Sequence, residues 1–242
     1  MSYNFEVESG KTVKFPVGGK YCDRDIVVTT ASVDTSNEDG LVTRSLTEYT
    51  NDRVNSVGSF SFYKNTAIKT VNFPKAKTIG ESAFFTSSLE SINAPEATTT
   101  GSAAFDVCKS LHTANFPKLQ TLGLYTFRDC QKLTRIVLPA LTKVNMYSCK
   151  GAISLQYADF GLVARIEAQV FYGCSALTTL ILRKTGTITT LANTNALTST
   201  PIANGTGYIY VPDNLIDSYK VATNWSTFAE QFKPISELEV VV

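Results

Sequence analysis

The chain has 242 residues, 43% hydrophobic and 18% charged, which is enough apolar material for an ordered core and unlike the composition of disordered chains. Its 22 Lys and Arg residues against 21 acidic ones leave a net charge of +1 without any basic run, which argues against a nucleic-acid or anionic-membrane partner. No apolar run reaches about 18 residues, and the segment after Met1 lacks a secretory pattern, so we expect neither a membrane span nor an export signal.

Residues 1–32 are predicted to form a small β module, because NFEVES, KTVKFP and DIVVTT have strand composition and are interrupted by Gly18-Gly19. The polar stretch VDTSNEDG, residues 33–40, is rich in turn formers and predicts a linker. Residues 41–56 look like an atypical first repeat. We therefore expect 33–56 to act as linker and N-terminal cap.

From residue 57 the sequence repeats with a period of about 22 residues, in the pattern (I/V/L)-G-x-x-x-F-x-x-C-x-x-L-x-x-I-x-x-P-x-x-x-x. Leucines keep the period without error, at Leu89, Leu111, Leu133, Leu155 and Leu177. Phenylalanine, cysteine and proline recur in the same register, so chance is a poor explanation. The copies begin at Val57, Ile79, Thr100, Leu122, Val144 and Ile166, with a broken seventh copy at Ile188.

Each copy contains a short alternating segment, as in Thr70–Asn72, which predicts a half-buried strand. The strands should stack in parallel about 4.8 Å apart into one continuous sheet, with each proline where pairing ends. The recurring glycine is expected to permit a tight turn. Copy five departs from the pattern, with Cys149 at the Phe position, Ala152 at the Cys position and Gly161 at the Pro position. This departure predicts a local bend. Two inward columns are expected, Val71, Ile92, Ile136 and Leu180, then Phe73, Phe116, Leu138, Phe160 and Leu182.

Residues 188–242 are predicted to hold the broken repeat and an α+β cap. The segment from Gly207 to Pro212 repeats the strand-then-proline pattern, and Asp213 is expected to cap a helix. Aromatic residues supply an apolar face beyond it, and the final ELEVVV is predicted to be a strand. Such a segment would plug the open end of the last repeat.

The cysteines and the single histidine are the candidates for catalytic or metal-binding chemistry. Cys108, Cys130 and Cys174 occur one per copy at a turn lining the core, so we expect them to pack as small apolar thiols, with a Cys108–Cys130 disulfide as the alternative. The fourth and fifth cysteines, Cys22 and Cys149, form no C-x-x-C pair with them. His112 is expected to be an ordinary surface side chain. Without a catalytic motif, we predict no catalytic residue, no metal and no cofactor.

Outward-facing strand residues would form a broad platform. Its early copies present Thr, Ser and Asn, which are satisfactory cross-strand neighbours on a soluble sheet. Its later copies present Tyr and Arg, which are enriched at interface hot spots. The candidate ligand face is therefore Arg135, Tyr157, Asp159, Tyr208 and Tyr210.

The repeats IGESAFFTSSLESINAP, GSAAFDVCKSLHTANFP and LGLYTFRDCQKLTRIVLP resemble the BspA-like (Treponema pallidum type) leucine-rich-repeat family over about residues 57–187. The resemblance implies a leucine-rich-repeat solenoid with a parallel strand ladder of about six repeats. GGKYCDRDIVVTT resembles a module at the start of many prophage-encoded proteins, and IYVPDNLIDSYKVATNWSTFAEQFKPISE resembles a cap of BspA-like proteins.

These resemblances imply a non-catalytic phage virion protein of the tail, baseplate or fibre. Its N-terminal module would attach to other virion proteins, and its solenoid face would bind a host surface protein or glycan. The alternative is a BspA-like adhesin at the bacterial surface or secreted, binding host protein or glycan. Self-association of the chain is left open, and an enzyme has no support in the sequence.

Overall fold

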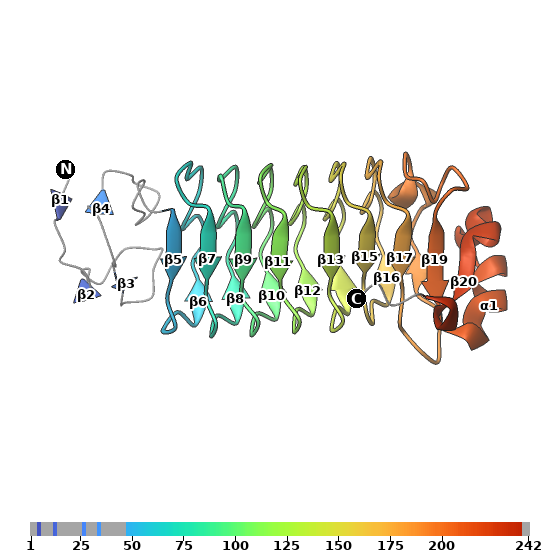
Figure 1. Ribbon diagram of the computed structural model, residues 1–242. Coiled ribbons are helices and arrows are strands. Elements are labelled where there is room, and N and C mark those ends of the chain that lie inside the picture. The colour runs from blue at the N-terminus through green and yellow to red at the C-terminus, as the bar shows by residue number, and fades with distance from the viewer. Residues whose placement is uncertain (1–3, 6–11, 14–25, 28–32, 35–46, 239–242) are drawn as a thin grey trace.

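The computed structural model describes residues 47–238, together with four two-residue strands nearer the N-terminus (Figure 1). In that N-terminal region β1 (Asn4–Phe5) pairs antiparallel with β4 (Val33–Asp34), and β2 (Thr12–Val13) pairs antiparallel with β3 (Ile26–Val27). The remainder of the predicted β module and linker, including Cys22, lies outside the described residues.

A stack of coils follows in the described chain, and each coil contributes one three- or four-residue strand to the row that begins with β5 (Figure 1). Neighbouring strands are parallel, as expected. The first group of this main sheet is β5 (Glu48–Thr50), β7 (Thr70–Asn72), β9 (Ser91–Asn93) and β11 (Thr113–Asn115). The second group is β13 (Arg135–Val137), β15 (Tyr157–Asp159), β17 (Thr179–Ile181), β19 (Tyr208–Val211) and β20 (Phe232–Pro234).

The coils also form a second parallel sheet, which the sequence did not reveal. Its strands have two residues each, too few for an alternating pattern to be visible, and they occupy the start of each repeat. They are β6 (Ser56–Val57), β8 (Thr78–Ile79), β10 (Thr99–Thr100), β12 (Thr121–Leu122) and β14 (Lys143–Val144), followed by β16 (Arg165–Ile166) and β18 (Thr190–Leu191).

The expectation of one continuous main sheet is wrong, because hydrogen-bonded pairing stops between β11 and β13. The interruption does not coincide with degenerate copy five, whose strand β15 pairs with both β13 and β17. The second sheet is interrupted between β14, at the start of copy five, and β16, at the start of copy six. The main sheet therefore has two halves, and the boundary lies one repeat before the degenerate copy.

The recurring glycine serves close approach between coils, not a tight turn as expected. Gly80, Gly101 and Gly123 have ordinary backbone angles, but a Cβ atom on Gly101 would lie 2.5 Å from the backbone nitrogen of Glu81. Copies five and six carry Asn145 and Glu167 at this position. The bond from Gly101 N to Ile79 O measures 2.7 Å, whereas that from Asn145 N to Leu122 O measures 3.2 Å. At Glu167, pairing with the preceding coil is lost.

The inward columns are confirmed. Val71, Ile92, Ile136 and Leu180 are buried, as are the residues of the second column. Behind them the phenylalanines of copies one to four stack face to face, with centroid distances of 4.7, 5.4 and 5.3 Å from Phe62 through Phe84 and Phe105 to Phe127. Each proline follows its strand within a β-turn, shown by the bond from Ala76 N to Phe73 O across Pro74.

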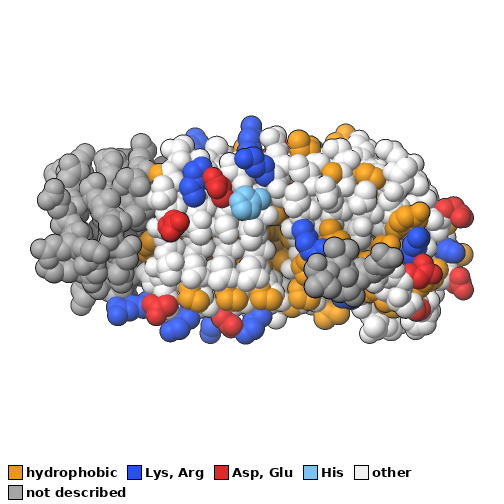
Figure 2. All heavy atoms as spheres, in the orientation of Figure 1, with side chains coloured by type: hydrophobic (Ala, Val, Ile, Leu, Met, Phe, Trp, Pro, Cys, Tyr) orange, Lys and Arg blue, Asp and Glu red, His pale blue; other side chains and the backbone are white. Residues whose placement is uncertain are grey.

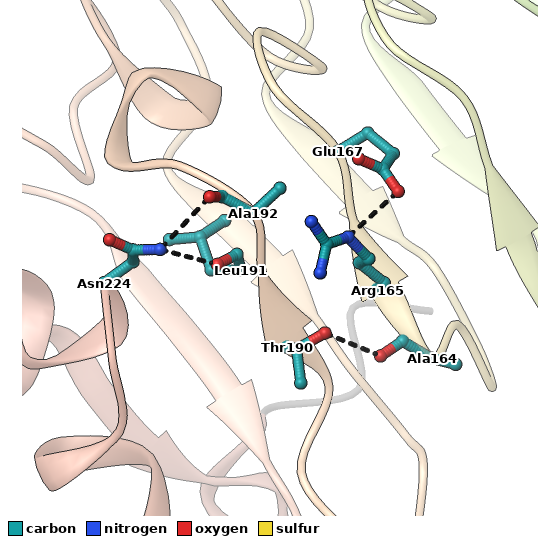
Figure 3. Close-up of polar contacts among 7 residues, drawn as sticks. All are labelled: Ala164, Arg165, Glu167, Thr190, Leu191, Ala192 and Asn224. Carbon is teal, nitrogen blue, oxygen red and sulfur yellow. Dashed lines mark hydrogen bonds and ion pairs between the residues drawn. The ribbon is translucent and has the colours of Figure 1, made fainter.

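The C-terminal cap follows β19. It contains the 3-10 turns η2 (Asp213–Leu215), η3 (Trp225–Gln231) and η4 (Ile235–Glu237) and the helix α1 (Ile216–Val221), while η1 (Thr194–Leu197) precedes it. The Nε1 atom of buried Trp225 donates to Thr189 O at 2.6 Å, and Thr189 N donates to the Tyr219 hydroxyl at 2.8 Å. The Asn224 amide donates to the carbonyls of Leu191 and Ala192 (Figure 3). The cap thus pairs with free backbone groups of the last coil and covers its open end, as expected.

Two details of the predicted cap are wrong. Asp213 is not a helix N-cap: it begins η2, and its Oδ1 atom accepts from the backbone nitrogen of Ser236 at 3.2 Å, since the chain turns directly out of β19. The beginning of the predicted strand ELEVVV is also different, because Glu237 ends a 3-10 turn. Residues 239–242 lie outside the described part.

Candidate functional site

The four cysteines of the described chain have a structural role. Cys108, Cys130, Cys149 and Cys174 are buried and free, so the packing interpretation is confirmed over the disulfide alternative. The thiols of Cys130 and Cys174 donate to the backbone oxygens of Phe105 and Cys149, at 3.2 and 3.0 Å. Burial raises the pKa of Cys108 and of Cys174 to about 12, so both remain neutral thiols and poor nucleophiles near neutral pH.

The single histidine is an ordinary surface residue. His112 is exposed, with its Nδ1 atom 3.0 Å from the Thr113 hydroxyl. Within residues 47–238 and the four N-terminal strands, the structure holds no group of three His, Cys, Asp or Glu side chains placed to bind a metal ion. No helix of the described chain is long and apolar enough to cross a membrane.

The main sheet brings Arg135 and Tyr157 together on adjacent strands. β13 and β15 pair in register at these residues, and the guanidinium carbon lies 3.7 Å from the centre of the tyrosine ring. Arg135 is exposed and Tyr157 half-buried, so neither fills the core. A guanidinium held over a ring keeps its N–H donors available at its edge, which suits a planar anionic group.

Tyr208 and Tyr210 lie farther along the same face, on β19. Tyr208 is exposed and Tyr210 half-buried. The Lys233 ammonium lies 4.0 Å from the centre of the Tyr208 ring. Sequence reasoning missed Lys233, although Phe232-Lys233-Pro234 repeats the strand-then-proline signature and forms β20, the last strand of the sheet.

Asp159 differs from the expectation, because its side chain is not part of the exposed face. The residue is 2% exposed, and its Oδ2 atom accepts from Arg183 at 2.7 and 2.8 Å. Its Oδ1 atom accepts from the backbone nitrogen of Gly161 at 3.2 Å. Ile181, opposite it on β17, is fully buried as well. The loop that returns after β17 carries Arg183 over the carboxylate, which sequence periodicity does not show.

The first half of the main sheet has a different surface. The Asn93 amide donates to Asn72 Oδ1 at 2.7 Å, and the Asn115 amide donates to Asn93 Oδ1 at 2.6 Å. Each of these two bonds joins an amide to the amide of the preceding strand, and the ladder runs beside a row of hydroxyls. The band over β7, β9 and β11 is largely free of charged side chains (Figure 2). The ladder ends at Asn115, where pairing to β13 is lost, and the aromatic and basic surface begins beyond it.

A second group, which sequence reasoning also missed, lies on the turns leading from the second sheet toward the main sheet. The rings of Tyr125 and Tyr147 stack at 5.0 Å, Arg128 lies 4.4 Å from the Tyr125 ring, and Lys150 lies 5.3 and 5.0 Å from the rings of Tyr147 and Tyr172. Tyr125 and Tyr147 both have positive φ and occupy equivalent positions one repeat apart, a 22-residue spacing that could have revealed the pair. These side chains chiefly engage one another.

Arg128 in that group also pairs with Asp106 of the preceding coil, at 2.5 Å. Burial raises the pKa of the Asp106 carboxyl, whereas the hydrogen bond that Arg128 donates to Asp106 raises the pKa of the guanidinium. The charge of this arginine is therefore engaged within the protein, unlike that of Arg135.

The family described as BspA type leucine rich repeat region matches in six copies, over residues 43–155 and 98–210. A T. pallidum leucine rich repeat protein is similar, with 16% identity, 82% of this chain and 92% of that chain covered, and a TM-score of 0.55. A search of curated proteins finds no matching relative.

Two larger solved proteins share the fold over part of their length. A leucine-rich repeat protein from Eubacterium ventriosum is 22% identical, with 70% of this chain and 48% of that chain covered and a TM-score of 0.59. The pneumococcal vaccine antigen PcpA is 13% identical, with 86% and 45% covered and a TM-score of 0.52. At these identities the likeness shows the solenoid fold alone.

Proposed function

The chain belongs to the family of BspA type leucine rich repeats, and from this premise we propose that it is a non-catalytic binding module of a bacterial surface adhesin. The face that binds is the second half of the main sheet, with Arg135, Tyr157, Tyr208 and Tyr210 toward the ligand. Host protein or glycan is the partner. Solenoids expose extended surfaces of this kind for binding, because each repeat adds one strand to a platform.

One observation carries the proposal: the Arg135 guanidinium stacked 3.7 Å from the centre of the Tyr157 ring, on one exposed and one half-buried strand position outside the core. Arginine and tyrosine dominate interface hot spots. The first half of the same sheet supplies the contrast, since its amides bind one another.

The test is attachment of the purified chain to host epithelial cells and to immobilised matrix proteins. The variant Arg135→Ala/Tyr157→Ala should lose attachment, while Thr70→Ala/Thr113→Ala, with exposed positions of the first half, should retain it. Both should unfold at the wild-type temperature. Full attachment of the first variant would contradict the assignment of this face.

A second candidate, a virion component, has one observation in its favour, the prophage-like stretch GGKYCDRDIVVTT at residues 18–30. In this proposal the N-terminal module attaches the chain to other virion proteins. Mass spectrometry of washed cell envelopes and of particles released from the source strain separates the two. Stoichiometric peptides on particles would favour the virion, and peptides on envelopes alone the adhesin.

A further inference from the structure

We propose that the main-sheet face from β13 to β20 binds an anionic polysaccharide, with Arg135 and Lys233 on its acidic groups and its sugar rings over Tyr157 and Tyr208. The inference rests on the proposed function, because it names the ligand class of the same face. Two positive charges on this face have no acidic partner among the described residues.

Strands β13, β15, β17, β19 and β20 carry three charged residues, Arg135, Asp159 and Lys233. Asp159 is buried and engaged by Arg183. Neither Arg135 nor Lys233 has an ion-pair partner among the described residues; each lies instead on the ring of a neighbouring tyrosine. The face therefore presents two cations and no free carboxylate of its own strands.

The two cation–ring pairs are regularly placed. Tyr157, Thr179 and Tyr208 are in register on three consecutive strands, so the two tyrosines are about 10 Å apart, two strand spacings. Thr179 places a hydroxyl between them. An extended chain laid across the strands would meet ring, hydroxyl and ring in succession, with a cation at either end.

The surrounding coils are also basic. Residues 130–212, all described, contain seven Lys and Arg residues and two acidic residues. Both acidic residues are paired, Asp159 with Arg183 and Glu167 with Arg165 (Figure 3). The cap from residue 213 to 238 adds two Lys and four acidic residues, so residues 130–238 together hold nine Lys and Arg against six Asp and Glu. This modest positive excess favours encounter with a polyanion.

A polysaccharide suits the surface better than an acidic protein. Protein interfaces have a desolvated apolar centre, but the exposed large apolar side chains of these strands are Val137 and Tyr208 alone. Flat strands with a hydroxyl and two tyrosines match the hydroxyls and C–H faces of sugars. The planar guanidinium matches a carboxylate or a sulfate.

The test measures binding of the full chain to polygalacturonate, to dextran sulfate, to carboxyl-reduced polygalacturonate and to polyglutamate. Wild type should bind one or both anionic polysaccharides, more weakly as salt rises. Arg135→Ala and Lys233→Ala should each weaken binding about ten-fold, the loss of one charge-assisted contact. Arg165→Ala is the matched control, since it removes the same charge from an exposed position of the other sheet, and should change binding less than about two-fold.

Binding to either the uronate or the sulfated polymer, with these losses, supports the proposal and identifies the acidic group. Equal binding of the carboxyl-reduced polymer, equal loss in Arg165→Ala, or tighter binding of polyglutamate would overturn it, the last in favour of an acidic protein. If no polysaccharide binds but Arg135→Ala/Tyr157→Ala still loses attachment to cells, the ligand class is wrong and the proposed function stands. Polysaccharide binding with attachment unchanged would instead remove the proposed function.

Discussion

The Cys108 thiol donates a hydrogen bond to the carbonyl oxygen of Phe84 in the preceding coil, at 2.9 Å. The same thiol lies 3.4 Å from the hydroxyl of Ser87, which occupies the equivalent position one repeat earlier. The buried thiols of Cys108, Cys130 and Cys174 at this position therefore tie their turns to the coil before them. Stability should depend on their hydrogen bonding as well as on their volume.

Replacement of Cys108 tests this tie. Cys108→Ala should lower the free energy of unfolding by about 1–2 kcal/mol, because it removes both a buried donor and packed volume. Cys108→Ser keeps a donor, as copy two does with Ser87, and should cost less. Urea unfolding of the two variants beside wild type is the measurement. Equal losses would mean that the hydrogen bond contributes nothing.

The thiols should also make the fold sensitive to alkali. An unfolded thiol loses its proton near pH 9, whereas burial raises the pKa of Cys108 and of Cys174 to about 12 in the folded protein. Stability is thus fully present below about pH 9 and falls as pH rises toward 12, by about 1.4 kcal/mol per pH unit for each thiol. Unfolding free energies at about pH 8 and pH 10 measure the slope. Cys108→Ala should reduce it, and an unchanged slope would exclude this thiol as a cause.

The close approach at Gly101 predicts a cost for any side chain there. Gly101→Ala places a Cβ atom 2.5 Å from Glu81 N and should destabilise the protein by about 1–3 kcal/mol, as overpacking does. Ser102→Ala, at the adjacent half-buried position, is the control and should stay within about 0.5 kcal/mol of wild type. Thermal or urea unfolding of both variants beside wild type measures the difference. A tolerated alanine at position 101 would mean that the coils can move apart freely.

Leu133 lies fully buried in the leucine column, so Leu133→Ala should cost about 2–5 kcal/mol. Its exposed neighbour offers the control Lys132→Ala, expected near zero. Chemical denaturation measures both. A loss below about 0.5 kcal/mol for the leucine variant would contradict the repeat register.

Asp159 should prove structural. Asp159→Asn weakens the pairing with Arg183 and should lower stability by about 1–3 kcal/mol, since a nearly buried acceptor of charged hydrogen bonds is altered. Ligand binding per folded molecule should stay close to wild type. A variant that folds with full stability but no longer binds would show that Asp159 contributes to ligand binding.

The sequence was sufficient to predict the repeat, the strands of the main sheet and the core. A 22-residue period carried by Leu, Phe, Cys and Pro can be satisfied only if every copy stacks alike, so inward columns such as Val71 and Ile92 follow from spacing. It also predicted that Arg135 and Tyr157 share a face, because strand register follows from the period.

Only the tertiary structure decided the rest. The two-residue strands of the second sheet are too short to show a pattern, and the close approach at Gly101 involves atoms one coil away. Lys233 reaches Tyr208 because the cap adds β20 to the sheet, and Arg183 covers Asp159 because an irregular loop folds back. These contacts join segments that do not repeat, so periodicity, which determines the coils, carries no information about them.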